Sequence, residues 1–198
     1  MAKTLLQMAG ADPAPAALSA GVLILIDMQN EYFDGPLALP GAAKAAEAAA
    51  GLLARARKLG TPVIHIRHRG REGGAFDPGA PRFQIHDSLA PAAGETVIDK
   101  GLPNAFAGTS LADELAAHPD KPLIVCGFMT HLCVSATVRS AIDHGRFSTV
   151  ISDATATRDL PDATDPARIV TADAVHLATL SALADRFAVV APASAIQD

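Results

Sequence analysis

The stretch Val22–Asp27, read as Val-Leu-Ile-Leu-Ile-Asp, decides the fold class of this chain. Its five apolar residues are continuous instead of alternating with polar ones, which is typical of a strand covered on both faces of a sheet. Similar apolar runs recur at 62–67, 122–127, 147–152 and 187–190, and helical patterns separate them at 41–59, 109–117, 133–144 and 165–185. This alternation predicts a three-layer α/β/α domain with a mostly parallel, Rossmann-like central sheet.

The composition limits the classes of protein to which the chain can belong. Of its 198 residues, 49% are apolar and 19% are charged, which indicates a single globular domain over 1–198 with residues 1–20 as an N-terminal extension. The net charge is −5 and no basic run is present, so we expect no nucleic-acid partner. Apolar runs stay far below the roughly 20 residues that cross a bilayer, so we expect no membrane partner.

The two cysteines differ in their sequence context. Two cysteines make no disulfide framework, and with no signal-peptide pattern at the N-terminus they predict a cytoplasmic protein. Cys126 lies inside the strand predicted at 122–127, where we expect a small buried side chain. Cys133 instead follows that strand after a short turn, at the predicted start of helix 133–144. There we expect the positive end of the helix dipole to favour the thiolate.

Asp27 and Cys133 both follow predicted strands. Because ligands of parallel sheets bind outside the carboxyl ends of the strands, we expect the two side chains to lie at the same edge of the sheet. If they converge there, the carboxylate can accept the thiol proton, which is the starting requirement for acyl transfer by a cysteine. The long Gly- and Pro-rich segment 70–91 is expected to cover the pocket, because long loops in compact domains often carry function.

Three blocks of sequence carry a family resemblance. They are Leu25–Asn30 (LIDMQN), Lys100–Leu111 (KGLPNAFAGTSL) and Gly127–Val134 (GFMTHLCV). In this order they resemble the isochorismatase-like cysteine hydrolases, the superfamily that includes nicotinamidases, N-carbamoylsarcosine amidohydrolase and ureide hydrolases. The resemblance extends over about residues 20–190.

The resemblance implies a catalytic triad of Asp27, Lys100 and Cys133. In that family the cysteine attacks a carbonyl carbon, the aspartate carries the thiol proton to the leaving amine, and the lysine holds the charges together. The resemblance also implies a cis peptide at Phe128–Met129 and an oxyanion hole formed by the backbone amides of Met129 and Cys133. It implies no cofactor, and a homo-oligomer, either a dimer or a tetramer.

Three histidines are candidate metal ligands. Nicotinamidases of this superfamily carry an Asp-x-His pair and a further histidine, and His65, His68 and His86 lie in the corresponding region. Here arginines stand where a cation site would need acids, so we expect no metal. We expect His65 and His68 to shape the floor of the pocket or to form hydrogen bonds within the strand.

Pocket walls are predicted from side chains close in sequence to the triad. The candidate substrate-binding residues are Phe33, Arg67, Phe106, His131 and Leu132. Arg67 would favour a carboxylate or carbonyl-rich substrate if it faces the pocket. His144 and His176 fall in predicted helices and are interpreted as structural, as is Asp153 at the end of a strand.

The sequence therefore predicts a cysteine hydrolase that cleaves a C–N bond of a small amide, ureide or carbamoyl compound through a thioester. One alternative is an isochorismatase-type vinyl-ether hydrolase, which needs no nucleophile and whose members typically lack the cysteine. Another is a non-catalytic binding domain with the same fold, for which an intact triad would bring no benefit. Sequence alone does not identify the substrate, because fold does not settle function.

Overall fold

A central sheet of six strands organises the molecule, seen in a computed structural model that describes residues 2–198. Its strands run in the order β3 (Thr96–Lys100), β2 (Val63–His68), β1 (Val22–Ile26), β4 (Leu123–Phe128), β5 (Ser148–Ala156) and β8 (Ala188–Ala191). All five neighbouring pairs are parallel. The two central strands, β1 and β4, are buried along their whole length, as the unbroken apolar runs predict.

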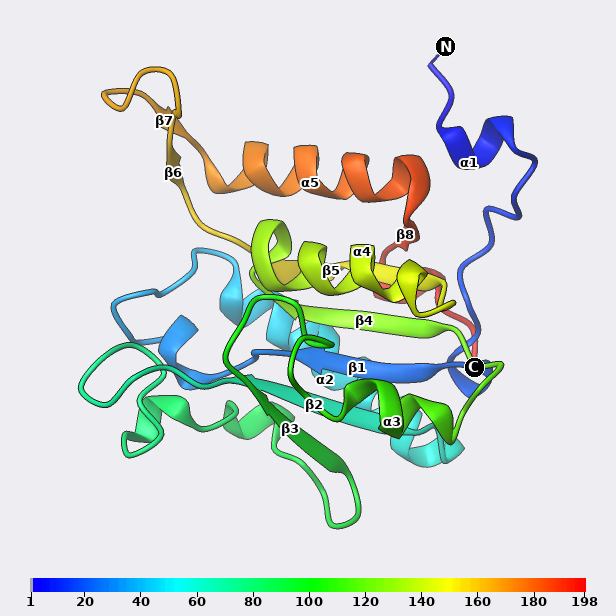
Figure 1. Cartoon of the computed structure of the whole chain (residues 1–198), viewed down its shortest axis with the longest axis horizontal. Coiled ribbons are helices and arrows are strands. Elements are labelled where there is room, and N and C mark those ends of the chain that lie inside the picture. Colours follow the sequence, from blue (N-terminus) through cyan, green and yellow to red (C-terminus); the bar gives the residue numbers. More distant parts are fainter. Residues whose placement is uncertain (1) are drawn as a thin grey trace.

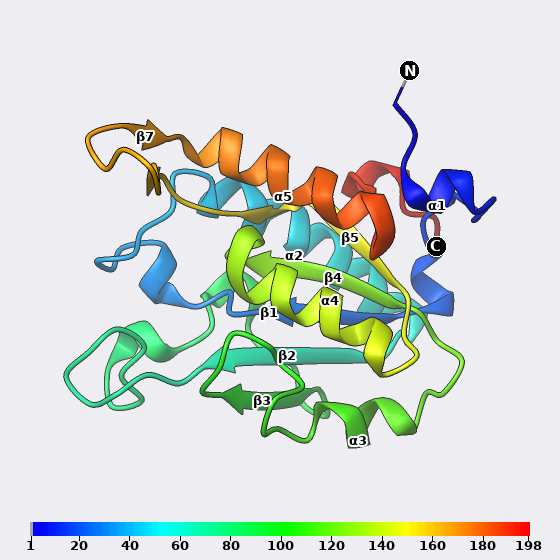
Figure 2. The same ribbon diagram turned by 45° about the horizontal axis from the view of Figure 1, so that its top comes forward.

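Helices cover both faces of this sheet, which confirms the predicted three-layer α/β/α architecture. Helix α2 (Ala42–Leu59) lies behind the sheet in Figure 1, and its alanines and Leu52 pack against Leu23 and Leu25 of β1. On the opposite face lie α3 (Leu111–Ala116), α4 (Ser135–Asp143) and α5 (Ala172–Arg186). Figure 2, turned by 45°, shows α4 in front of the sheet and α5 beside the β5–β8 edge.

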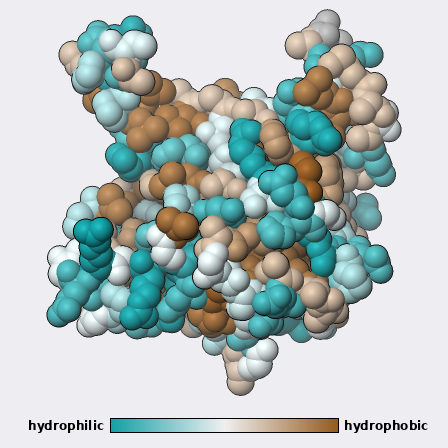
Figure 3. Space-filling view, viewed as in Figure 1, coloured by the Kyte–Doolittle hydropathy of each residue, from teal (hydrophilic) through white to brown (hydrophobic). Residues whose placement is uncertain are grey.

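Two projections rise beside α5. One is the N-terminal segment with α1 (Leu5–Met8), and the other is the short antiparallel hairpin of β6 (Leu160–Pro161) and β7 (Ile169–Val170). Figure 3 shows both standing above the rest of the surface. Within residues 2–198, none of the helices combines the length and the hydropathy that a membrane span requires.

The predicted start of the last helix is wrong. Asp165-Pro166 is an equally good turn sequence, and here it forms the tip of the β6–β7 hairpin, where the Asp165 carbonyl accepts the Arg168 amide at 2.9 Å. The helix begins only at Ala172, after Thr171, whose hydroxyl accepts the amide of Ala174. Strand β3 was not predicted, because Ile98 is the only buried apolar side chain of this edge strand.

Candidate active site

Strand order brings the ends of β1 and β4 together. The chain runs outward from β1 to β2 and β3, and then crosses back to place β4 on the other side of β1. At such a reversal, parallel sheets bind ligands outside the carboxyl ends of the two central strands. Asp27 follows β1 there, and the turn that carries Cys133 follows β4.

Asp27 is held in an uncommon backbone conformation. Its φ is +53°, in the left-handed region, which Asp tolerates better than most residues. Its amide still donates to the Ile66 carbonyl at 2.9 Å, so the residue remains tied to β2. The side chain is fully buried. A strained, buried acid at the end of a central strand is typical of a functional position.

Lys100 joins the other polar residues of the site. It is the last residue of β3 and lies beside His68 of β2 in the sheet register. Its Nζ lies 2.7 Å from Oδ2 of Asp27, 3.2 Å from Sγ of Cys133 and 3.2 Å from Nδ1 of His68. An ammonium has three N–H donors, and these three groups account for all of them.

Cys133 lies in a π-helical turn, Thr130–Val134, and not in the first turn of an α-helix. The α-helix begins at Ser135, so the predicted helix start at 133 is wrong. The Phe128–Met129 peptide before this turn is cis. The Met129 carbonyl accepts the amides of Leu132 at 3.0 Å and Val134 at 3.2 Å, which fixes the turn around the cysteine.

The electrostatics of this cluster favour a protonated thiol. Burial, followed by the charge of Asp27, raises the pKa of Cys133 to about 12, and the ammonium of Lys100 opposes this only in part. The expectation that a helix dipole favours the thiolate is therefore wrong here. Burial also raises the pKa of Asp27, while Lys100 at 2.7 Å favours its carboxylate form. A reaction at the Cys133 sulfur would therefore need a neighbouring base.

Aromatic rings cover the cluster. Tyr32 is 2% exposed, and its ring lies 5.1 Å from that of Phe76 and 5.5 Å from that of Phe128. Phe76 comes from the 70–91 segment and also lies edge-on to His68 at 5.2 Å. Its amide donates to the buried Glu31 carboxylate at 3.3 Å. Part of the long segment therefore packs over the residues around the triad.

Phe33 lies on the outer side of these rings. It stacks on His86 at 3.9 Å, lines a surface hollow with Ala43 and Ala46 of α2, and lies edge-on to Phe128 at 5.9 Å. The neighbouring Tyr32, in the short 3₁₀ turn Asn30–Tyr32, is the more deeply buried of the two. A substrate contact of Phe33 stays a prediction.

Arg67 is placed elsewhere. It points to the opposite face of β2 from His68, where Nε lies 2.7 Å from Asp99 and the guanidinium covers the Phe83 ring. The cationic residue near the site is Arg158, which follows β5. Burial raises the pKa of Tyr32 above its usual range, which the Arg158 charge opposes in part, and burial followed by that charge lowers the pKa of His131. The buried Nε of Arg158 has no hydrogen-bond partner among residues 2–198.

The remaining predicted pocket residues surround the turn in different ways. His131 is half-buried, with Nδ1 2.5 Å from the Thr157 hydroxyl, and Leu132 is 39% exposed. Phe106 packs in the same apolar cluster as Cys133, but its ring face stacks on His144 at 4.2 Å. Asp153 accepts the Ala193 amide at 2.8 Å, in keeping with its structural interpretation.

The three histidines considered as metal ligands are separated. His65 is buried on the α2 side of β2, with Nε2 2.9 Å from Glu95, and His86 binds the Ser88 hydroxyl. Only His68 joins the triad, where the donor atoms of Asp27, His68 and Cys133 lie within 4.8 Å of one another. The Lys100 ammonium already contacts all three groups, so its charge opposes a cation at that point.

Three residues of the site were missed from the sequence. Tyr32 and Phe76 belong to turns whose direction no periodicity reveals. Arg158 lies in Thr157-Arg158-Asp159, directly after an apolar strand, and the rule that polar residues at strand ends mark the site could have found it.

Comparisons with known proteins agree with this geometry. The family profile described as Isochorismatase domain matches residues 21–194. The crystal structure of an isochorismatase from Pseudomonas putida KT2440 superposes with a TM-score of 0.94 at 44% identity, over 99% of this chain and 100% of that chain.

Two similar proteins have named activities. Streptothricin hydrolase of Streptomyces noursei is 35% identical over 88% of this chain and 63% of its own length. Maleamate amidohydrolase of Pseudomonas putida is 35% identical over 65% of this chain and 68% of its own length. With the family profile matching nearly the whole sheet, the chain belongs to the isochorismatase family and is a hydrolase.

Proposed function

We propose that this hydrolase cleaves a C–N bond of a small amide, ureide or carbamoyl compound through a thioester on Cys133. The observation that carries the proposal is the buried contact of one ammonium, Lys100, with both the carboxylate of Asp27 and the thiol of Cys133. A buried ion pair is costly to desolvate and is weak support for stability, so its presence favours a chemical role.

In the first half of the proposed reaction, Asp27 takes the Cys133 proton while sulfur bonds to the carbonyl carbon of the substrate. The carbonyl electron pair moves to oxygen, and the backbone amides of Met129 and Cys133 donate to it. When the oxyanion collapses, the C–N bond breaks and Asp27 gives its proton to the leaving amine. Ammonia or an amine departs, and the acyl group remains on sulfur.

In the second half, water attacks the thioester while Asp27 takes a proton from it. The C–S bond breaks, the acid is released, and the sulfur is reprotonated. Lys100 balances the negative charge that passes between Asp27 and Cys133, and as its three donors are already engaged it makes no contact with the substrate.

The position of Arg158 favours a substrate that bears a carboxylate. Nη1 of Arg158 lies 3.4 Å from the Asp159 carbonyl, but its buried Nε has no partner among residues 2–198. This N–H, on a guanidinium whose charge acts on Tyr32 and His131, can give a charge-assisted hydrogen bond to an anion. Maleamate, the substrate in the name of one relative, is itself such an amide. We expect Arg158→Met to raise KM about tenfold or more for carboxylate-bearing amides. Neutral amides of the same size are the matched comparison. An equal rise of KM for neutral and carboxylate-bearing amides would reject a preference of Arg158 for the carboxylate.

The experiment that tests the proposal is ammonia release across small amides, ureides and carbamoyl compounds, with Cys133→Ala as the blank. Any amide that turns over is then treated with hydroxylamine, which intercepts a thioester and gives a hydroxamate. Turnover without a trapped adduct, and with little loss in Cys133→Ser, would favour direct attack by water. That outcome would point to the vinyl-ether branch of the family.

A further inference from the structure

The turn that carries Cys133 is tied to the rest of the molecule at its first residue by a histidine on a different element. The hydroxyl of Thr130 lies 2.9 Å from Nδ1 of His176, which comes from the first turns of α5. Thr130 is fully buried, and His176 is half-buried. Residue 176 lies 43 positions beyond the cysteine, so this contact joins two parts of the chain that are distant in sequence.

The contact pairs one hydroxyl with one imidazole nitrogen. A neutral imidazole has one donor and one acceptor nitrogen, and a hydroxyl can both donate and accept, so the pair forms a hydrogen bond in either tautomer of His176. The bond requires the Thr130 hydroxyl and a polar atom at the position of Nδ1.

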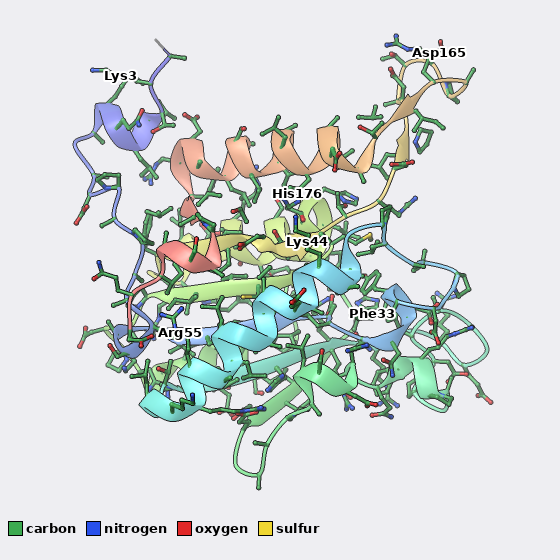
Figure 4. The ribbon with its side chains drawn as sticks, turned by 180° about the vertical axis from the view of Figure 1, so that it is seen from behind. Lys3, Phe33, Lys44, Arg55, Asp165 and His176 are labelled. Atoms are coloured by element: carbon green, nitrogen blue, oxygen red, sulfur yellow. The ribbon has the colours of Figure 1, made fainter. Side chains whose placement is uncertain are left out.

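His176 also lines a hollow that is separate from the triad. This cavity of about 230 Å³ lies between the N-terminal ends of α2 and α5 and the end of β5, and Lys44 and Asp153 line it as well. Figure 4 shows His176 on α5 and Lys44 on α2 close to each other at this point. His176 thus lines this hollow and also contacts the turn at Thr130, and among the described residues it forms no hydrogen bond with the sulfur of Cys133.

We infer that His176 is a positioning residue for the nucleophile turn, a role that rests on the proposed function. Thr130 directly follows Met129, whose carbonyl holds the amides of Leu132 and Val134. A shift of Thr130 therefore moves the Met129 and Cys133 amides relative to the sulfur. A misplacement of about 1 Å in such a constellation costs about a hundredfold in rate.

Three substitutions test this role. His176→Phe keeps a ring but removes the hydrogen-bonding nitrogen, Thr130→Val keeps the shape but removes the hydroxyl, and His176→Asn keeps a polar atom at the position of Nδ1. We expect the first two to lower kcat at least tenfold with KM changed less than threefold, and His176→Asn to retain at least a third of kcat. The double variant His176→Phe with Thr130→Val should be no slower than either single variant.

A matched control is Thr179→Val on the same helix, because the Thr179 hydroxyl donates to the Val175 carbonyl and to no other group within residues 2–198. It should leave kcat within twofold of the parent. Losses that add in the double variant, or His176→Phe and Thr130→Val proteins that fold and keep kcat within twofold, would overturn the inference.

A second readout keeps the inference separate from the proposed function. If no amide is turned over, the rate constant for alkylation of Cys133 by iodoacetamide is measured in the same variants by peptide mapping. We expect it to change at least threefold in His176→Phe and Thr130→Val and to stay within twofold in His176→Asn and Thr179→Val. Equal rates in all four would overturn the inference whatever the reaction of the enzyme.

Discussion

Lys100 is the residue on which the site depends most. Its ammonium is surrounded by a carboxylate, a thiol sulfur and a neutral imidazole nitrogen, and His68 stays neutral because burial and the Lys100 charge lower its pKa to about 4. An ammonium with all donors engaged has little freedom to move. Its charge would therefore be available throughout the proposed reaction, which transfers a proton between two of its neighbours.

Replacing Asp27 by Asn should separate the two effects of this carboxylate on Cys133. The amide keeps the shape but accepts no proton, so we expect turnover to fall by a factor of a hundred or more in a folded protein. The same change should lower the pKa of Cys133, because the negative charge of Asp27 raises it and Lys100 remains. Turnover is measured with the best amide of the panel, and the thiolate by its absorbance at 240 nm, with Cys133→Ala as the blank. Turnover close to that of the parent would mean that Asp27 stabilises the turn after β1 and takes no part in proton transfer.

The two thiols should differ in how alkylation depends on pH. With a pKa of about 12, Cys133 should react slowly with iodoacetamide at pH 7 and about tenfold faster for each pH unit up to pH 10, since only the thiolate reacts. Cys126 is fully buried in β4 and should react only on unfolding. Peptide mapping after timed labelling distinguishes them. Faster labelling of Cys126, or a rate at Cys133 that is flat with pH, would contradict this.

Asp27 and Cys133 were expected to converge because both follow predicted strands, and the structure brings both into contact with Lys100, which only the family resemblance indicated. The direction of single side chains was harder to predict. Phe33 and Arg67 each lie one residue from a side chain that packs closer to this cluster, Tyr32 and His68 respectively. A shift of one residue reverses the face in a strand, so spacing from a motif indicates the neighbourhood of a site but not its walls.

Among the elements, β4 constrains the site through a glycine. Gly127 has a φ of +132°, and a Cβ there would lie 2.1 Å from the Ile26 carbonyl oxygen in β1. The close approach of the two strands sets the spacing between Asp27 and the Cys133 turn. This glycine is the second-last residue of the strand that leads to the turn, in the block Gly127–Val134.

Gly127→Ala should therefore destabilise the protein severely. Substitutions that clash with the main chain at a positive φ are among the most destabilising ones. We expect the free energy of unfolding to fall by about 3 kcal/mol or more. The matched control is Gly51→Ala on the exposed face of α2, where an added Cβ meets open space. That change should raise stability by about 0.5–1 kcal/mol. Urea unfolding measures both, and similar values for the two variants would contradict the role of the close approach.

The buried strands were predictable, and the exposed edge strand was not. Five strands were located to within one residue of their observed start, because fully buried strands read as apolar runs. Edge strand β3 carries Lys100, yet it has an exposed Val97 and a half-buried Asp99 and shows no such run. The site depends on this least visible strand, and only the family resemblance indicated that Lys100 takes part.

At the scale of the whole molecule, acid should weaken the fold in two stages. Burial lowers the pKa of His65, His68, His131 and His176, so the unfolded chain binds protons more readily than the folded one below about pH 6.5. Stability should therefore fall from pH 6.5 toward pH 4. The Arg57 guanidinium lowers the pKa of Glu95 to about 2, so the contribution of this carboxylate is lost between about pH 4.5 and pH 2.

The urea midpoint measured at each pH from 7 to 4 checks this expectation. His68→Asn removes one of the four histidines, and its midpoint should fall less steeply between pH 6.5 and pH 4 than that of the parent. A midpoint that stays constant or rises down to pH 5 would mean that these histidines are protonated in the folded protein as easily as in the unfolded chain.

The polar cluster lies at the ends of strands, whereas the residues around it come from other segments, and this affects how substrate preference can evolve. Asp27, Lys100 and Cys133 depend on β1, β3 and β4, whereas Phe76 and Arg158 are carried by segments outside these strands. Random substitution confined to 71–80 and 157–159 would leave the saturated ammonium and its three neighbours untouched. A library built in this way would sample new substrates while most of its members keep Asp27, Lys100 and Cys133 in place, which makes the chain a suitable parent for laboratory evolution of its hydrolase activity.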